Sequence, residues 1–220
     1  MLKKVRELVQ PTYKKLKCWG HGWQHILNVV EWSKKIAQGE SVDSFLCQIA
    51  AYCHDLGRLE EEEKNLVNRV AGAPSAHAAL SVKPTEKILD KIEIAGGDRT
   101  NILEAVKLHN IRKYEGPNQI LSVLQDADRA DGYGKFGILR LAVFNCRMPI
   151  PEPRNEIEID TLFKKLKSDL KNHPEYKVEM LHTLEFVFGW YDELLNTESA
   201  RAYLSDGYKF LKSFYREINS

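Results

Sequence analysis

The residues best suited to chemistry in this sequence are an adjacent histidine and aspartate, His54 and Asp55. Leu46, Ala50 and His54 are four residues apart, which places the imidazole on the apolar face of a predicted helix. Asp55 follows where this helix should end, and Gly57 is a suitable stop because glycine adopts the left-handed conformation easily. A buried histidine and carboxylate without partners would be unfavourable, so the pair predicts a bound divalent metal ion.

Three further histidines are predicted to face the same interior. His25 is followed by apolar residues four, seven and eleven positions later, and His109 is preceded by apolar residues three, four and seven positions earlier. His77 has a similar spacing, although Pro84 interrupts that helix or begins a new one. Any one of them could be a core histidine bonded to a backbone carbonyl. Several inward histidines together with an inward aspartate favour a shared metal site.

A further carboxylate comes from the acidic segment 125–131. Leu121, Leu124 and Asp128 are spaced three and four residues apart, whereas Asp126 lies roughly 160° round the helix from Asp128. Asp128 is therefore the predicted buried ligand, and Asp126 is expected at the surface. Two imidazoles and two carboxylates without a thiolate suit manganese, iron, cobalt or magnesium better than a closed structural zinc site. The predicted ligands are His25, His54, Asp55 and Asp128.

Helical periodicity recurs through nearly the whole chain, so the predicted fold is all-α, with residues 1–220 in a single domain. We expect a peripheral connector around 149–172, made stiff by its prolines, and a C-terminal helical segment packed on the core. The predicted helices are Leu2–Leu16, Gly22–Ala37, Val42–His54, Ala76–Ile94, Asp98–His109, Gln119–Ala130, Gly134–Cys146, Ile157–Leu170, Tyr176–Leu195 and Glu198–Ile218.

Two regions have open interpretations. The acidic run Glu60–Glu63 is interpreted as a solvated first turn of a helix, with attraction of a metal ion as the alternative. The C-terminal segment is rich in aromatic residues and could form a lid, a wall of the core or a dimer face, of which the core wall is favoured. A homodimer therefore stays an open expectation.

Composition argues against several classes of function. The formal net charge is +1, so no overall field directs the chain toward nucleic acid or a membrane surface. The four cysteines form no C-x-x-C pair, and the N-terminal residues lack the apolar run of a signal peptide. A reduced, cytoplasmic setting is expected, without a membrane-spanning segment.

The order of the candidate ligands carries a family resemblance. His25, then His54-Asp55, then Asp128 resembles the H…HD…D signature of the HD superfamily of metal-dependent phosphohydrolases. Segments 21–29, 125–129 and 134–140 are similar to small bacterial and archaeal HD hydrolases, some of which are nucleotide pyrophosphohydrolases. The resemblance covers about residues 18–147 and resumes at 197–217, and it implies an HD-domain-like helical bundle.

The resemblance implies hydrolysis of a phosphoester or phosphoanhydride by a metal-activated water, with His54 and Asp55 as catalytic residues. The implied substrate is a nucleotide or another small phosphorylated metabolite. Cationic groups must then offset phosphate charge, and Arg58 is the first candidate, although a surface ion pair with Glu61 or Glu62 is an equal alternative. The other candidates for substrate binding are His21, His77, His109, Lys64, Arg112 and Arg129.

The same pattern leaves other activities open. His77 and His109 extend it to H…HD…H…H…D, which some HD families use to hold two metal ions. Those families include phosphodiesterases and di-iron oxygenases. A regulatory HD module that binds a nucleotide without turnover is a further alternative. It is supported only by Gly22 and Asn28, because the subgroup usually has aspartate and arginine at these positions.

Overall fold

The computed structural model describes residues 1–67 and 75–220, and within these ranges it contains helices and no strand, which confirms the predicted all-α fold. No helix in either range is long and apolar enough to cross a bilayer. The elements, with η1 a 3₁₀ turn and η2 a π-helical turn, are α1 (Leu2–Tyr13), η1 (Trp19–His21), α2 (Trp23–Gly39), α3 (Ser44–Cys53), α4 (Arg58–Glu63), α5 (His77–Lys91), α6 (Gly96–Leu108), α7 (Gln119–Ala130), α8 (Gly134–Phe144), α9 (Glu156–Asn172), α10 (Pro174–Gly189), η2 (Trp190–Leu194) and α11 (Glu198–Asn219).

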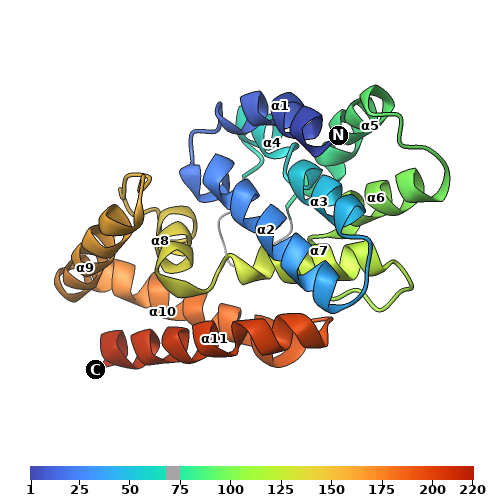
Figure 1. Ribbon diagram of the computed structural model, residues 1–220. Helices are drawn as coiled ribbons and strands as arrows, with labels where there is room; N and C mark the ends of the chain where they lie inside the picture. The colour runs from blue at the N-terminus through green and yellow to red at the C-terminus, as the bar shows by residue number, and fades with distance from the viewer. Residues whose placement is uncertain (68–74) are drawn as a thin grey trace.

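The helices form two groups that share α11 (Figure 1). Helices α1 to α7 gather on one side, α8 to α10 on the other, and α11 runs along both. The buried residues follow this division. Leu195, Ala200 and Leu204 belong to the hydrophobic core of α1–α7, whereas Leu211 and Phe214 belong to the core built with α8–α10. Helix α9, which lies in the region predicted as a connector, packs in this second core.

Helix α3 lies in the centre of the first group. The Asp43 side chain caps its first turn by accepting hydrogen bonds from the backbone N–H groups of Phe45 and Leu46. From Leu46 to Cys53 every residue except Gln48 is buried. A helix that is apolar on all sides belongs in the interior of a protein. The carboxyl end of α3 therefore delivers the residues that follow it, His54 and Asp55, into the core.

Gly57 has a different role from the one predicted. Its φ is −74°, so no left-handed residue ends α3 at this position. A Cβ at Gly57 would overlap the carbonyl oxygen of His77 and lie 2.7 Å from the backbone nitrogen of Ser81. The backbone N–H of Gly57 also donates to Ser81 Oγ at 2.8 Å. Glycine is needed here because α5 passes close to the turn, and this contact brings His77 next to Asp55.

Several element boundaries differ from the predictions. Helix α5 continues through Pro84 instead of breaking there. The predicted helix Tyr176–Leu195 divides into α10 and the π-helical turn η2, a feature that often lies at functional sites. The acidic run forms α4, but Glu61 is fully buried, so the expectation of a solvated run was wrong for this residue.

Candidate metal centre

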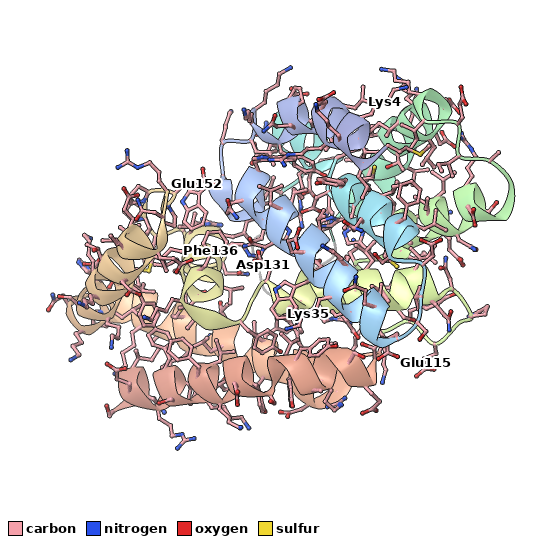
Figure 2. All side chains as sticks on the ribbon, in the orientation of Figure 1. Lys4, Lys35, Glu115, Asp131, Phe136 and Glu152 are labelled. Atoms are coloured by element: carbon pink, nitrogen blue, oxygen red, sulfur yellow. The ribbon has the colours of Figure 1, made fainter. Side chains whose placement is uncertain are left out.

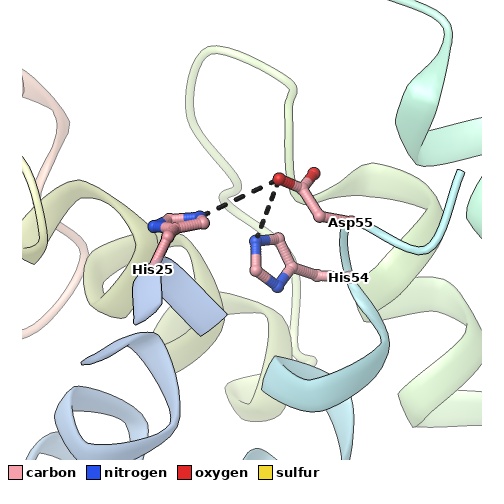
Figure 3. A group of neighbouring side chains, drawn as sticks. All are labelled: His25, His54 and Asp55. Carbon is pink, nitrogen blue, oxygen red and sulfur yellow. Dashed lines mark ion pairs between the residues drawn. The ribbon is translucent and has the colours of Figure 1, made fainter. Parts of the chain in front are cut away.

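Three buried side chains meet at the end of α3 (Figure 3). His54 and Asp55 are 0% and 2% exposed, and His25 of α2 is 0% exposed. Asp55 Oδ2 lies 3.8 Å from His25 Nε2 and 3.7 Å from His54 Nε2. Asp128 Oδ1 lies 3.5 Å from His25 Nε2 and 4.0 Å from His54 Nε2. Ligands about 2.1 Å from one ion lie about 3–4 Å from each other, so each carboxylate oxygen has the spacing of a metal ligand to both imidazole nitrogens, and His54 also groups with His109 and Asp128.

The second oxygen of Asp55 faces another pair of histidines. Asp55 Oδ1 lies 3.2 Å from His77 Nε2 and 3.7 Å from His109 Nε2. His77 begins α5 and His109 follows α6, and both are buried. Asp55, His77 and His109 therefore form a second group with the spacing of metal ligands. Asp55 is common to both groups and can bridge two ions.

Hydrogen bonds to backbone carbonyls determine the tautomers of two of these histidines. His54 Nδ1 lies 2.8 Å from the carbonyl oxygen of Ala51, and His109 Nδ1 lies 2.8 Å from that of Val106. A carbonyl can only accept, so Nδ1 carries the proton in both rings. Nε2 is then a bare lone pair in each histidine, which is the form that binds a metal.

The other two histidines have the same tautomer. His25 Nδ1 lies 2.7 Å from the carboxylate of Asp131, which can only accept when ionised. His77 Nδ1 lies 2.6 Å from Ser75 Oγ, and this hydroxyl donates its own proton to Glu61. Ser75 Oγ therefore accepts from His77. All four Nε2 lone pairs point into the space around Asp55.

This arrangement needs a cation. Nε2 of His25 and Nε2 of His54 are buried and have no hydrogen-bond partner. Nε2 of His77 and Nε2 of His109 lie 3.0 Å apart, and two unprotonated nitrogens at that distance repel each other. A divalent ion would satisfy these nitrogens and neutralise Asp55 and Asp128, so the residues present fit the group that the family resemblance implies.

The electrostatic surroundings keep the histidines ready to bind. Burial lowers the pKa of His54 to about 4 and holds the pKa values of His77 and His21 well below their ordinary value. Burial alone would raise the pKa of Asp55, but the Arg58 guanidinium, with His54 and His77, keeps it below its usual range. At neutral pH the rings of His54 and His77 are therefore neutral and the Asp55 carboxylate is charged, as ligation requires.

Acidification should destabilise the metal-free protein through His54. The unfolded chain takes up this proton near pH 6.5, whereas the folded protein resists it until about pH 4. The folded state binds fewer protons, so the contribution is complete above pH 6.5 and is lost as pH falls toward 4. We expect the free energy of unfolding, from urea titrations of chelator-treated protein, to decline across this window. His54→Gln should decline less steeply, and equal slopes in both proteins would contradict the assignment.

The two acids of α7 have roles that differ in part from the predicted ones. Asp128 does face His25 and His54, but its side chain is 33% exposed toward a cavity. Asp126 is fully buried, so the expectation of a surface residue was wrong. Its carboxylate accepts hydrogen bonds from the backbone N–H groups of Asn196 and Thr197 and from the Thr197 hydroxyl. Asp126 thus fixes the start of α11 and contacts no candidate ligand.

Arg58 lies beside the centre. Its Nε is 3.3 Å from Asp55 Oδ1, its Nη1 is 3.0 Å from Glu61 Oε2, and its Nη2 is 3.3 Å from His21 Nε2. The predicted alternative, an ion pair with Glu61, exists but is not at the surface, because Glu61 is fully buried. Arg58 therefore presents a positive charge between the candidate metal ligands and the adjacent cavity.

The other predicted cations differ in their relation to the centre. Arg112 and Arg129 line the cavity, but Arg129 donates to the carbonyl oxygens of Leu194 and Arg112. Lys64 pairs with exposed Glu60 and is absent from the cavity lining. Arg58, His21, His77 and His109 all line it. His77 and His109 are candidate ligands themselves, Arg58 contacts the ligand Asp55, and His21 contacts Arg58.

A cavity of about 910 Å³ opens over the centre. Its lining includes Asp128 and Arg58, beside the candidate ligands, and Phe186 of α10 and Trp190 of η2. Phe186 is 39% exposed, and its ring centroid lies 5.8 Å from that of Trp190. The cavity is large enough for a small phosphorylated molecule with a ring system.

Sequence reasoning missed two buried acids beside the centre. Glu61 accepts hydrogen bonds from Ser75 and from the backbone N–H groups of Ala76 and His77, which fixes the start of α5. Asp131 contacts His25 directly. The signal for Asp131 was its position three residues after Asp128, which puts both acids on neighbouring parts of the end of α7. Glu61 had no such signal, because it stands within a run of four glutamates.

Comparison with known families agrees with this geometry. The profile of the HD domain matches residues 22–134, just over half of the chain. The chain belongs to the HD domain family. The matched segment contains all the candidate ligands on both sides of Asp55, whereas the aromatic residues Phe186 and Trp190 of the cavity lining lie beyond it. Family membership supports a hydrolase.

Individual relatives are distant but extend over most of the chain. The uncharacterized protein YpgQ of Bacillus subtilis is 22% identical over 209 residues, which cover 90% of this chain and 83% of YpgQ. A crystal structure of YpgQ in complex with ADP aligns with a TM-score of 0.56 and 19% identity, covering 99% of this chain and 92% of that chain. A predicted HD superfamily hydrolase from an uncultured Thermotogales bacterium aligns with a TM-score of 0.54 and 20% identity, covering 81% and 92%. These structures share the fold.

Proposed function

We propose that this HD domain protein is a metal-dependent phosphohydrolase that cleaves a phosphoester or phosphoanhydride bond of a small phosphorylated metabolite. The observation that carries the proposal is the convergence of four Nε2 lone pairs with Asp55 and Asp128 beside a cavity that His77, His109 and Asp128 line. A divalent ion held there supplies an activated water near neutral pH and a clamp for a phosphoryl oxygen. His25, His54, Asp55 and Asp128 would hold one ion, and His77, His109 and Asp55 a second.

The residues around the centre suit a phosphate group. Arg58 is held in place by Asp55 and Glu61, so its guanidinium is already oriented before substrate binds. Such a pre-oriented cation stabilises negative charge that develops on phosphoryl oxygens during the reaction. His21, whose Nε2 lies 3.3 Å from Arg58 Nη2, adds a polar group on the same side of the cavity.

The aromatic residues of the cavity lining support a nucleotide as the substrate. Phe186 and Trp190 offer aromatic surface to a planar base, and stacking of a base on an aromatic ring contributes about 1–3 kcal/mol. Arg112 also lines this cavity. The structural similarity to YpgQ, which has been crystallised with ADP, agrees with this choice.

Replacement of Arg58 should separate phosphate binding from metal binding. Arg58→Ala removes the cation nearest the centre but no candidate ligand, so we expect turnover to fall about 100-fold while bound metal is retained. Arg99→Ala is the matched control, because Arg99 pairs with exposed Asp90 and does not line the cavity. This control should stay close to wild-type turnover. Loss of metal or of the folded state in Arg58→Ala would assign Arg58 to structure.

The function itself is tested by a substrate screen on purified protein. Nucleotides, sugar phosphates and generic phosphoesters are incubated with Mn²⁺, Fe²⁺, Co²⁺ or Mg²⁺, and released phosphate or pyrophosphate is measured beside elemental analysis of the protein. Metal with turnover supports the hydrolase. Tight nucleotide binding without turnover with any ion would instead support a regulatory module. Bound iron with consumption of dioxygen would support an oxygenase, which the second group of ligands also permits.

A further inference from the structure

Asp131 is a buried carboxylate that contacts one candidate ligand but offers no atom to the metal groups. It follows α7, is 4% exposed, and lies where the ends of α2, α7 and α8 meet (Figure 2). Its Oδ2 is 2.7 Å from His25 Nδ1, on the opposite side of the ring from Asp55 and Asp128. Asp131 therefore acts on the centre only through His25.

This contact selects the form of His25 that can bind a metal. An imidazole has two neutral tautomers, and only the one with the proton on Nδ1 leaves a lone pair on Nε2. In His54 and His109 the ring donates to a backbone carbonyl of the helix that precedes it, and this hydrogen bond fixes that tautomer. His25 lies near the start of α2 and bonds instead to a side chain on another helix end. Its tautomer thus depends on residue 131.

Two neighbours hold Asp131 in place. Asn28 Nδ2 donates to Oδ1 at 2.7 Å, and Arg140 Nε lies 3.1 Å from Oδ2. Asn28 stands three residues after His25, so the same turn of α2 presents both the ligand and a donor to Asp131. Arg140 of α8 also donates to the carbonyl oxygen of Gly20, and its side chain is only 5% exposed. The carboxylate is therefore fixed by contacts from two elements besides the ring.

We propose that Asp131, held by Asn28 and Arg140, is the positioning residue that fixes the tautomer and ring orientation of His25. Removal of such a partner from a metal-binding histidine typically lowers metal affinity 10- to 100-fold. The effect on metal affinity rests on the proposed metal site, whereas the effect on the tautomer does not. The family profile ends at residue 134, so Arg140 ties the centre to a helix outside the matched segment.

The first measurement is the tautomer of His25 in metal-free protein, read from the ¹⁵N chemical shifts of both ring nitrogens in histidine-labelled samples. The signal of His25 is assigned by its absence in His25→Gln. Wild type should show the proton on Nδ1. Asp131→Ala should show a fraction with the proton on Nε2. Asp131→Asn should keep the wild-type form, because its amide oxygen can accept from Nδ1 at the position of Oδ2, while its amide nitrogen at the position of Oδ1 can donate to Asn28 once the Asn28 amide turns by 180°.

The second measurement is the affinity for Mn²⁺ by competition with a chelator. We expect a loss of about 10- to 100-fold in Asp131→Ala, a substantial recovery in Asp131→Asn, and a smaller loss in Asn28→Ala. Gln24→Ala is the matched control, because Gln24 donates to Asn28 but does not contact Asp131. It should bind Mn²⁺ as wild type does.

Asn28→Ala keeps the test decisive if Asp131→Ala leaves Arg140 unpaired and fails to fold. An unchanged tautomer together with wild-type affinity in Asn28→Ala and in every folded Asp131 variant would overturn the proposal. If wild type itself binds no Mn²⁺, the result contradicts the proposed metal site and the function that depends on it. The tautomer measured in metal-free protein still decides the role of Asp131.

Discussion

A chain carrying His54→Ala and Asp55→Ala is expected to retain almost no divalent metal. The double change removes a nitrogen and an oxygen from the first group of ligands and the shared carboxylate from the second. Each group is then left with too few ligands to compete with water for an ion. Elemental analysis of purified protein after dialysis checks this result, and phosphate release should disappear with the metal.

The control for this variant is His173→Ala, a histidine exposed at the start of α10. It should keep the wild-type metal content. His77→Ala adds a finer measurement, because it affects only the second group of ligands. If two ions are bound, His77→Ala should lower the metal stoichiometry without abolishing it. A double variant that holds as much metal as wild type would show that the centre is wrongly placed.

The pattern of the sequence was enough to bring most of this centre together. Helical spacing placed His25, His54 and His109 on buried faces, and each is buried in the structure. Helical spacing predicts burial because the side chains on the apolar face of a helix all point into the same interior, whichever helices pack against that face. The all-α fold follows from the same periodicity, and it is confirmed over residues 1–67 and 75–220.

Periodicity fails where a second element decides the environment. Asp126 was expected at the surface because it lies away from the stripe of Leu121 and Leu124. The segment before α11 covers that side of α7 and surrounds Asp126 with backbone donors. Gly57 illustrates the same limit. Glycine is required at position 57 because α5 passes close to this turn. The residues around Gly57 in the sequence cannot reveal that contact. Contacts between segments far apart in the chain therefore account for these errors.

The two acids of α7 provide the sharpest separation of metal binding from folding. Asp128→Asn should lose activity and most of its bound metal, because an amide oxygen does not neutralise the ion as a carboxylate does. Its contacts are with the candidate ligands, so the fold should be unaffected. Asp126→Asn should instead keep its bound metal and lose stability. Every neighbour of the Asp126 carboxylate is a donor, and an amide group there would face at least one of them.

The expected destabilisation of Asp126→Asn is about 1–3 kcal/mol, the usual effect of leaving a buried polar group unsatisfied. For a chain of this size, each 1 kcal/mol lowers the melting temperature by about 2–4 °C. Metal stoichiometry and thermal unfolding should be measured for both variants side by side. A metal-free Asp126→Asn beside an Asp128→Asn that is unchanged in metal content would reverse the assignment. It would mean that Asp126, and not Asp128, supplies the ligand from α7.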